Sequence, residues 1–352
     1  MTNKLHHYTI ANGNDLWDCI SEKIPKNSEE KELEPKEIFD YYIRQSFEEG
    51  YEFLGEPSLK LSKEYGFCLS STKQVYDRYF SKEMRLEELL SDDIRECYEP
   101  KKTKKTTSGN EFRSGKFYSV ASSSRFAVSS FTEKLNGKLC YIKRINGEEI
   151  KKAKFEYDAP IVGIQRERHC PQLDFFFKTN KGTYFIEAKC HEIFDNHKSI
   201  RLGPNYKDFL NGHNLCKSYA CKIRIDRNGN KTEDVFLSLE GNKEKNRFLL
   251  AEDFDCKLKT YHFDFKQFLC HLMGILSYAE EHKDEEIYFY YLVYKNELYI
   301  QETKSKIYEE LEAEIKEVFK VFGNRFPKIH FGLCYHNEYN TLKELKPVDW
   351  GN

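Results

Sequence analysis

The sequence predicts an α/β protein in which helices flank a mixed β-sheet, preceded by a mostly helical N-terminal region. Three observations support this class. Residues 1–99 are polar with helical periodicity, residues 100–110 hold four lysines and no apolar side chain, and helical and strand-like segments alternate from residue 112 onward. We therefore expect two regions, residues 1–105 and residues 106–352, of which the second carries the sheet.

In the first region, residues 35–47 open with Pro35, and their apolar residues recur every three to four positions, which predicts a helix. Residues 71–80 and 83–90 are two further short helical segments. The second region begins with a predicted helix over residues 117–135, whose small serine and alanine side chains suit packing against a sheet.

The remaining elements of the second region follow from alternation, capping and turn residues. Strands are expected at 139–144, 154–157 and 161–164, a hairpin at 173–189, and a second hairpin around Asn228-Gly229. They are followed by a helix over 264–282 capped by Asp264, a strand at 287–294, a helix over 304–322 ended by Gly323, and a strand at 328–335. This order corresponds to an α-β-β-β-α-β core with mixed strand directions.

The hairpin at 173–189 carries charges on strands that are otherwise apolar. If Lys178 and Thr183 close a four-residue loop, Asp174 lies opposite Glu187 on one face, with Cβ atoms roughly 5 Å apart. Lys189 shares that face, roughly 7 Å along the strand from Glu187. Facing like charges destabilise a sheet, and a divalent cation between them removes this cost. Ligands that are all oxygen favour Mg²⁺ or Mn²⁺.

Pro171, Asp174 and the segment Glu187-Ala188-Lys189 resemble the signature of the PD-(D/E)XK nuclease superfamily, which has the restriction-endonuclease-like fold. Two residues separate the proline from the aspartate here. The resemblance covers roughly residues 112–335. It implies that Asp174 and Glu187, with the carbonyl of Ala188, hold a metal, and that Lys189 helps to activate water. Glu-x-Lys alone is a weak signal because it recurs elsewhere, as at Glu34–Lys36, so the hairpin context carries the interpretation.

Four further residues are accessory candidates. The resemblance implies a fourth acidic ligand from the first helix or the first strand, which would be Glu133 or Glu156. Gln267 and His271 lie four positions apart on the 264–282 helix, so they share a face that is able to lean toward the site. For each of them, an ordinary surface or core role is the alternative. A solvated hairpin face with a simple Glu–Lys pair is the alternative for the main site.

The predicted function is that of a metal-dependent endonuclease acting on DNA, of restriction or phage-defence type. Basic residues are the candidate phosphate contacts, and solvated loops are the alternative. They are Lys101, Lys102, Lys104 and Lys105 in the lysine-rich run, and Lys198, Arg201 and Lys207 after the hairpin. The other function class is a catalytically inactive protein of the same fold that binds nucleic acid or protein.

Bulk composition limits these options. The net charge is −2, from 56 Lys and Arg against 58 Asp and Glu, so DNA binding needs a local basic groove. RNA remains an alternative substrate, and a homodimer is one arrangement left open. There is no run of 18 apolar residues and no signal-peptide pattern, so no membrane partner is expected. The eleven cysteines lack framework or zinc-ligand spacing, which favours reduced thiols in the cytoplasm.

Overall fold

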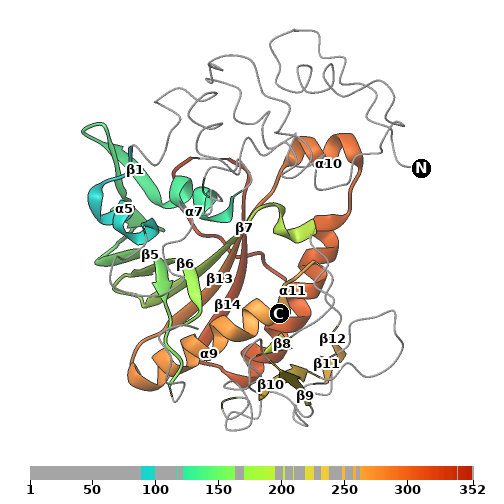
Figure 1. Ribbon diagram of the computed structural model, residues 1–352. Helices are drawn as coiled ribbons and strands as arrows, with labels where there is room; N and C mark the ends of the chain where they lie inside the picture. Colours follow the sequence, from blue (N-terminus) through green and yellow to red (C-terminus); the bar gives the residue numbers. More distant parts are fainter. Residues whose placement is uncertain are drawn as a thin grey trace.

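A mixed five-stranded sheet forms the centre of the computed structural model (Figure 1). The structure describes residues 89–99, 117, 122–162, 170–194, 209, 262–338 and 340–350, together with short strands between 201 and 258. The strands, in spatial order, are β14 (Ile329–His336), β13 (Ile287–Tyr294), β7 (Thr183–Lys189), β6 (Gln172–Lys178) and β5 (Lys152–Asp158). β7, β13 and β14 run parallel, whereas β5, β6 and β7 pair antiparallel, as the predicted mixed sheet requires.

Helices pack on both faces of this sheet. The helices of the described residues are α5 (Asp92–Tyr98), α7 (Ser123–Phe131), α9 (Phe265–Glu281), α10 (Glu297–Thr303) and α11 (Ile307–Arg325), with a 3₁₀ turn η4 (His191–Phe194). Phe131 of α7 stacks on Phe175 of β6 on one face. Phe268 of α9 packs against Phe289 of β13 and Phe319 of α11 on the other face.

The predicted hairpins, the 264–282 helix and the last two strands are confirmed to within a few residues. β6 and β7 pair with Lys178 opposite Thr183, which leaves the expected four-residue loop. β9 (Tyr219–Ile225) and β10 (Lys231–Leu237) pair antiparallel around Asn228-Gly229, and Arg201–Leu202 adds a third strand, β8. Asp264 caps α9 by accepting a hydrogen bond from the backbone N–H of Gln267.

The first predicted helix is too long and must be corrected. α7 ends at Phe131, and residues 132–135 instead form β1 (Thr132–Leu135), which pairs with β2 (Lys138–Tyr141). The reason is the turn Asn136-Gly137, in which both residues have positive φ, as a tight hairpin turn requires. The predicted 139–144 strand is divided between β2 and β3 (Arg144–Ile145), and a second turn of the same kind, Asn146-Gly147, joins β3 to β4 (Glu148–Glu149).

Two other predicted elements differ. The 161–164 strand is absent from its described part, since Ile161 and Val162 lie outside any strand. The 304–322 helix begins later and ends later, because Lys304 adopts a left-handed conformation that ends α10. Gly323 lies inside α11 and does not end it. A short pair, β11 (Phe248–Leu249) and β12 (Lys257–Leu258), was not predicted.

The predicted helices of residues 1–88 lie outside the described residues. Residues 90–98 pack into the same core as the sheet: Leu90, Ile94 and Tyr98 are fully buried, and Tyr98 lies against Phe155 of β5. This contact crosses the boundary expected near residue 105. No helix in the described ranges is long and apolar enough to span a membrane.

We predict opposite effects for two Gly→Ala changes in helices. A Cβ at Gly274 in α9 would lie 2.5 Å from the carbonyl oxygen of Ala159, whereas a Cβ at Gly323 in α11 meets only a Phe331 ring carbon at 3.9 Å. Alanine favours helix by about 1 kcal/mol over glycine, so Gly323→Ala should raise the free energy of unfolding by up to that amount. Gly274→Ala should lower it by about 1–3 kcal/mol through the clash. Urea unfolding of both variants checks this, and an equal gain for both would contradict the close packing of α9.

Candidate active site

The β6–β7 hairpin places Asp174, Glu187 and Lys189 on the sheet face that α9 covers. On this face Phe176 and Phe185, which lie two positions from Asp174 and Glu187, both contact Tyr278 of α9. Side chains alternate along a strand, so Asp174, Glu187 and Lys189 share this face. The observed register agrees, because Phe175 pairs with Ile186 and Phe176 with Phe185. The antiparallel pairing of β6 with β7 therefore brings the three predicted residues together.

Asp174 lies where the two strands stop pairing. The ladder between β6 and β7 ends at Phe175 and Ile186, one position before Asp174. Beyond it, the Oδ2 atom of Asp174 accepts a hydrogen bond of 2.8 Å from the backbone N–H of Ala188. The carboxylate thus takes the place of a strand carbonyl, and this bond fixes it beside the Glu187-Ala188-Lys189 segment.

Lys189 connects the hairpin to α9. Its Nζ donates to Oε1 of Glu187 at 2.6 Å and to Oε1 of Gln267 at 2.7 Å. Glu187 is 2% exposed and Lys189 is 9% exposed, so the pair is nearly dehydrated. A buried ion pair needs such additional hydrogen bonds, because the desolvation cost otherwise exceeds the attraction between the charges. Gln267 therefore holds the lysine in place from the first turn of α9.

His271 faces the other oxygen of Glu187. Its Nδ1 lies 3.3 Å from Oε2 of Glu187, and neither atom has a hydrogen-bond partner among the described residues. Burial, together with the nearby charge of Lys189, lowers the pKa of His271 to about 3. The imidazole is therefore neutral at neutral pH, and the contact is not an ion pair. The site keeps one buried carboxylate oxygen and one ring nitrogen without partners.

The carboxylates of the hairpin resist ionisation. Burial, followed by the charge of Glu187, raises the pKa of Asp174 well above its usual range. Burial raises the pKa of Glu187 to about 7, although Lys189 opposes this shift. Burial alone would lower the pKa of Lys189, but Glu187, Glu192 and Asp174 outweigh it and raise the pKa, so the lysine stays protonated. Two carboxylates with raised pKa values beside one ammonium are typical of functional sites.

The donor set fits a hard divalent cation in part. Asp174 and Glu187 offer carboxylate oxygens, and the unpartnered Oε2 of Glu187 is one oxygen that a cation is able to use. In the described part of the chain no group of three or more His, Cys, Asp or Glu side chains converges on one point. A cation here would therefore depend on the two carboxylates, a main-chain oxygen and water, which is the ligand set that Mg²⁺ accepts more readily than Zn²⁺.

Of the accessory candidates, the structure brings Gln267 and His271 to the site and leaves Glu133 away from it. Glu133 lies on β1 and not on a helix, paired with Cys140. Lys198 and Lys207, and the lysine-rich run with Lys101, Lys102, Lys104 and Lys105, lie outside the described residues. Arg201 lies on β8, and its side chain is not described.

Glu156 points to the opposite side of the sheet because the strand changes its alternation there. Phe155 packs on Phe175, on the α7 face, whereas Tyr157 stacks on Phe176, on the α9 face. Glu156 between them has a φ of 47°, a left-handed conformation uncommon for a residue other than glycine. The hydroxyl of Ser124 in α7 donates to its carboxylate at 3.5 Å. The structure thus shows Glu156 turned toward α7.

Sequence reasoning missed three polar residues beside Lys189. Tyr291 of β13 pairs in register with Glu187 across the parallel strands. Glu192 follows the hairpin and accepts a hydrogen bond from the N–H of Cys190 at 2.8 Å. Asp264 was predicted only as a helix cap. Of the three, only Glu192 could have been predicted from its neighbours in the sequence, because it follows Glu187 by five residues. The other two depend on strand order and parallel register, which no short sequence pattern specifies.

The fold and site together define a class: an α/β protein with two carboxylates, a lysine, a glutamine and a neutral histidine gathered on one buried face of a mixed sheet. Comparison with known proteins finds no matching family model, no matching curated protein and no matching solved structure. The function must therefore be argued from this geometry.

We predict that Asp174→Asn stabilises the protein at neutral pH. The folded-state pKa of Asp174 is raised above the ordinary value, so the folded chain holds this proton more tightly than the unfolded chain. The Asp174 carboxyl therefore contributes its full share of the free energy of unfolding below about pH 4, and this contribution is lost as the pH rises through the folded-state pKa. Asparagine cannot ionise and still accepts from Ala188, so the gain should grow with pH to on the order of 1 kcal/mol.

Thermal unfolding from pH 4 to pH 8 measures this difference. Asp158→Asn is the control, because Asp158 lies on the neighbouring strand β5 and its carboxylate accepts from the side chain of Gln172. A stability difference for Asp174→Asn that stays constant across this range would contradict the proposed burial of the Asp174 charge.

Proposed function

We propose that this protein is a metal-dependent nuclease that hydrolyses phosphodiester bonds in DNA, with a restriction-endonuclease-like core. One observation carries the proposal: Asp174, Glu187 and Lys189 share one buried face of the β6–β7 hairpin, tied together by the bonds of Asp174 to Ala188 and of Lys189 to Glu187. The order of helix, antiparallel strands, helix, parallel strand, helix and parallel strand is compatible with this core.

Each residue has a chemical role in this proposal. Asp174, Glu187 and the carbonyl of Ala188 would hold Mg²⁺ or Mn²⁺. A bound divalent ion supplies a water of lowered pKa and neutralises phosphate oxygens. Lys189 would orient the attacking water and stabilise the negative charge that develops at phosphorus. Its hydrogen bond to Gln267 would hold the lysine in position while Glu187 serves as a ligand.

The neutral state of His271 fits the same purpose. A protonated histidine 3.3 Å from Glu187 would add a positive charge that competes with a cation for the carboxylate. Burial prevents this, since it lowers the pKa of His271 to about 3. The imidazole therefore contributes a neutral polar wall behind Glu187 and adds no positive charge that would compete with a metal.

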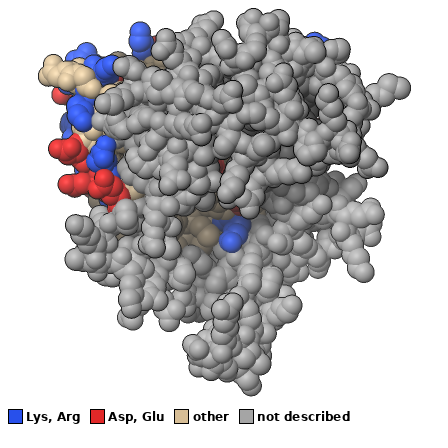
Figure 2. Space-filling view, turned by 45° about the horizontal axis from the view of Figure 1, so that its top comes forward, with Lys and Arg blue, Asp and Glu red and all other residues tan. Residues whose placement is uncertain are grey.

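DNA is the proposed partner, with restriction or defence as the setting. The net charge of −2 means that the contact must use local basic clusters. Figure 2 shows described Lys and Arg side chains beside Asp and Glu side chains on the same part of the surface, so this part carries both signs. Basic side chains for the phosphate backbone would come from the lysine-rich run and from Lys198, Arg201 and Lys207.

The alternative function is a catalytically inactive binding module of the same fold. The near-neutral charge favours it, as do the two hydrogen bonds that already engage the ammonium of Lys189. The two functions differ in metal dependence, because a binding module has no use for a cation between Asp174 and Glu187.

We predict DNA cleavage that requires Mg²⁺ or Mn²⁺ and stops with EDTA. Asp174→Ala and Lys189→Ala should each lower the cleavage rate by a factor of at least about 100, because each removes a group that acts at the reacting phosphate. Lys152→Ala, an exposed lysine on β5, is the control and should cleave at the wild-type rate. Plasmid and oligonucleotide cleavage, with DNA and RNA in parallel, provides the measurement. A purified Asp174→Ala protein as active as wild type would refute the assignment, and inactivity of every form on all substrates would favour the binding module.

We also predict that replacing Lys101, Lys102, Lys104 and Lys105 together with alanine weakens DNA binding and flattens its dependence on salt. Each lost phosphate contact reduces the slope of log affinity against log salt by about 0.9. Titration of labelled DNA at several salt concentrations, with Mn²⁺ affinity measured as a control, checks this. Unchanged DNA affinity at every salt concentration would leave this run as an ordinary solvated linker.

A further inference from the structure

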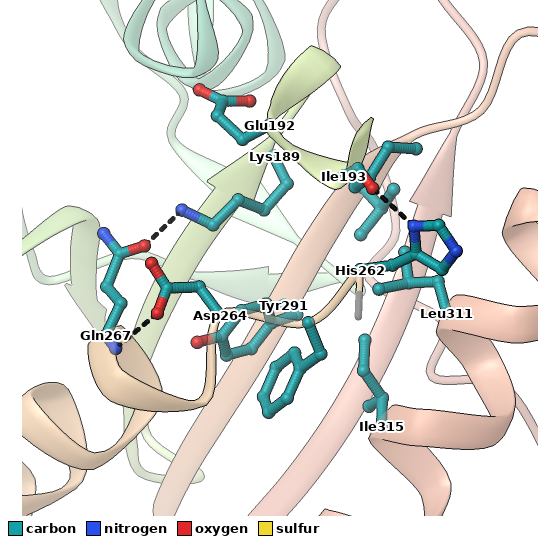
Figure 3. A pocket seen from close by; sticks show the side chains of 11 residues that line it. Lys189, Glu192, Ile193, His262, Asp264, Gln267, Tyr291, Leu311 and Ile315 are labelled. Atoms are coloured by element: carbon teal, nitrogen blue, oxygen red, sulfur yellow. Dashed lines mark hydrogen bonds between the residues drawn. The ribbon is translucent and has the colours of Figure 1, made fainter. Parts of the chain in front are cut away.

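A cavity of about 160 Å³ opens next to Lys189, on the side of the lysine toward β13 and α11 (Figure 3). One part of its wall is apolar and is formed by Ile193, Phe263, Val293, Leu311 and Ile315. The rest of the wall is polar and is formed by Lys189, Glu192, His262, Asp264, Gln267 and Tyr291. Figure 3 shows Lys189, Asp264, Gln267 and the oxygen of Tyr291 on one side, with His262, Leu311 and Ile315 on the other.

The hydroxyl of Tyr291 is a buried polar group in this wall that lacks a hydrogen-bond partner among the described residues. The side chain is 1% exposed. The ring is held by Phe263 at 5.1 Å and Phe289 at 5.5 Å between ring centroids, so it cannot turn away freely. Figure 3 shows its oxygen on the side of Asp264 and Gln267. An unpartnered buried hydroxyl is destabilising, and a ligand that accepts a hydrogen bond from it would remove that cost.

The protonation states of the polar end are set by burial and by Lys189. Burial, together with the charge of Glu187, raises the pKa of Tyr291 well above its usual range, so the hydroxyl stays a donor. Burial would raise the pKa of Glu192, but His191 and Lys189 outweigh it and lower the pKa, so Glu192 is ionised at neutral pH. The polar end therefore presents both donors and acceptors within one small space.

We propose that this cavity binds the pyrimidine base of a nucleotide whose phosphate lies at the Asp174–Glu187 pair, with a preference for cytosine. The inference rests on the proposed function and names a base subsite for it. Lys189 lines the cavity and contacts Glu187, so one side chain separates the cavity from the carboxylates. A phosphate at the hairpin and its own base in the cavity are compatible with that separation.

Volume and polarity select the base. A cavity of about 150 Å³ accommodates a six-membered ring such as benzene, so the present space suits a pyrimidine better than a purine. Cytosine carries an amino group that donates and ring acceptors beside it. Its amino group would face the carboxylate of Asp264, and its ring acceptors would receive hydrogen bonds from the hydroxyl of Tyr291 and the ammonium of Lys189. Uracil and thymine place a carbonyl where cytosine has its amino group, and a carbonyl that faces the Asp264 carboxylate is repelled.

A base in this cavity has to leave its stack in DNA. Unstacking and unpairing a base cost more free energy in a duplex than in a single strand. The proposal therefore favours single-stranded or unpaired DNA at the cleavage position.

Calorimetric titration of the full-length protein with mononucleotides, in the presence of Mg²⁺, tests this proposal. The ligands are deoxycytidine monophosphate, deoxyuridine monophosphate and deoxyribose phosphate, so that only the base differs. We expect deoxycytidine monophosphate to bind at least about tenfold more tightly than the other two, a difference of about 1.4 kcal/mol.

Two variants complete the experiment. Tyr291→Phe keeps the ring and should weaken deoxycytidine monophosphate about tenfold without changing deoxyribose phosphate. Leu311→Phe fills the cavity and should remove the difference between the two ligands, while Val321→Phe, on α11 but outside the cavity wall, should not. If Leu311→Phe fails to fold, Tyr291→Phe remains decisive, since it only removes a hydroxyl.

The outcomes separate this proposal from the proposed function. Equal affinity of the wild type for all three ligands, with DNA cleavage intact, would overturn the base subsite and leave the nuclease. A cytosine preference that Tyr291→Phe abolishes, without any DNA cleavage, would support the subsite and overturn the nuclease. An unchanged cytosine preference in both variants would place the base elsewhere and overturn the assignment of this cavity.

Discussion

Desolvation of two carboxylates and one ammonium on the β6–β7 hairpin is the constraint around which the described structure is organised. Each buried ion costs several kcal/mol unless bonds compensate for it. The compensation comes from three groups on β7 and α9: the N–H of Ala188 for Asp174, Lys189 for Glu187, and Gln267 for Lys189. An apolar hairpin would pack on α9 without such cost. The retention of the charges at the centre of the sheet is therefore the physical reason to assign them a chemical role.

The part of the site on a single hairpin and a single helix was predictable from the sequence. The register of the hairpin follows from its four-residue loop and from alternation, so Asp174, Glu187 and Lys189 were assigned correctly to one face. Gln267 and His271 follow from helical spacing and from the capping residue Asp264. These signals are local, because the residues that define each pattern are less than 20 positions apart.

The rest depended on non-local pairing or on unusual backbone conformations. Tyr291 reaches the site only because β13 pairs parallel to β7, and nothing in either segment specifies that register. The early helix was predicted too long because the Asn136-Gly137 turn was overlooked, although the same dipeptide was used correctly at Asn228-Gly229. Glu156 was placed on a regular strand, and its left-handed conformation turns the side chain to the other face. No composition or periodicity argument predicts such a single residue.

The parallel pairing of β7 with β13 has a consequence for the chain during its synthesis. Phe185 pairs with Phe289, 104 positions later, and Gln267 and His271 also come from this later segment. A ribosome that has released the hairpin has not yet made the side chains that stabilise Lys189 and border Glu187. The nascent hairpin therefore keeps its charges hydrated, and the site is assembled only when the second half of the chain emerges. Because translation runs from the hairpin toward α9 and β13, the cluster of charged side chains becomes organised only after α9 covers that face of the sheet.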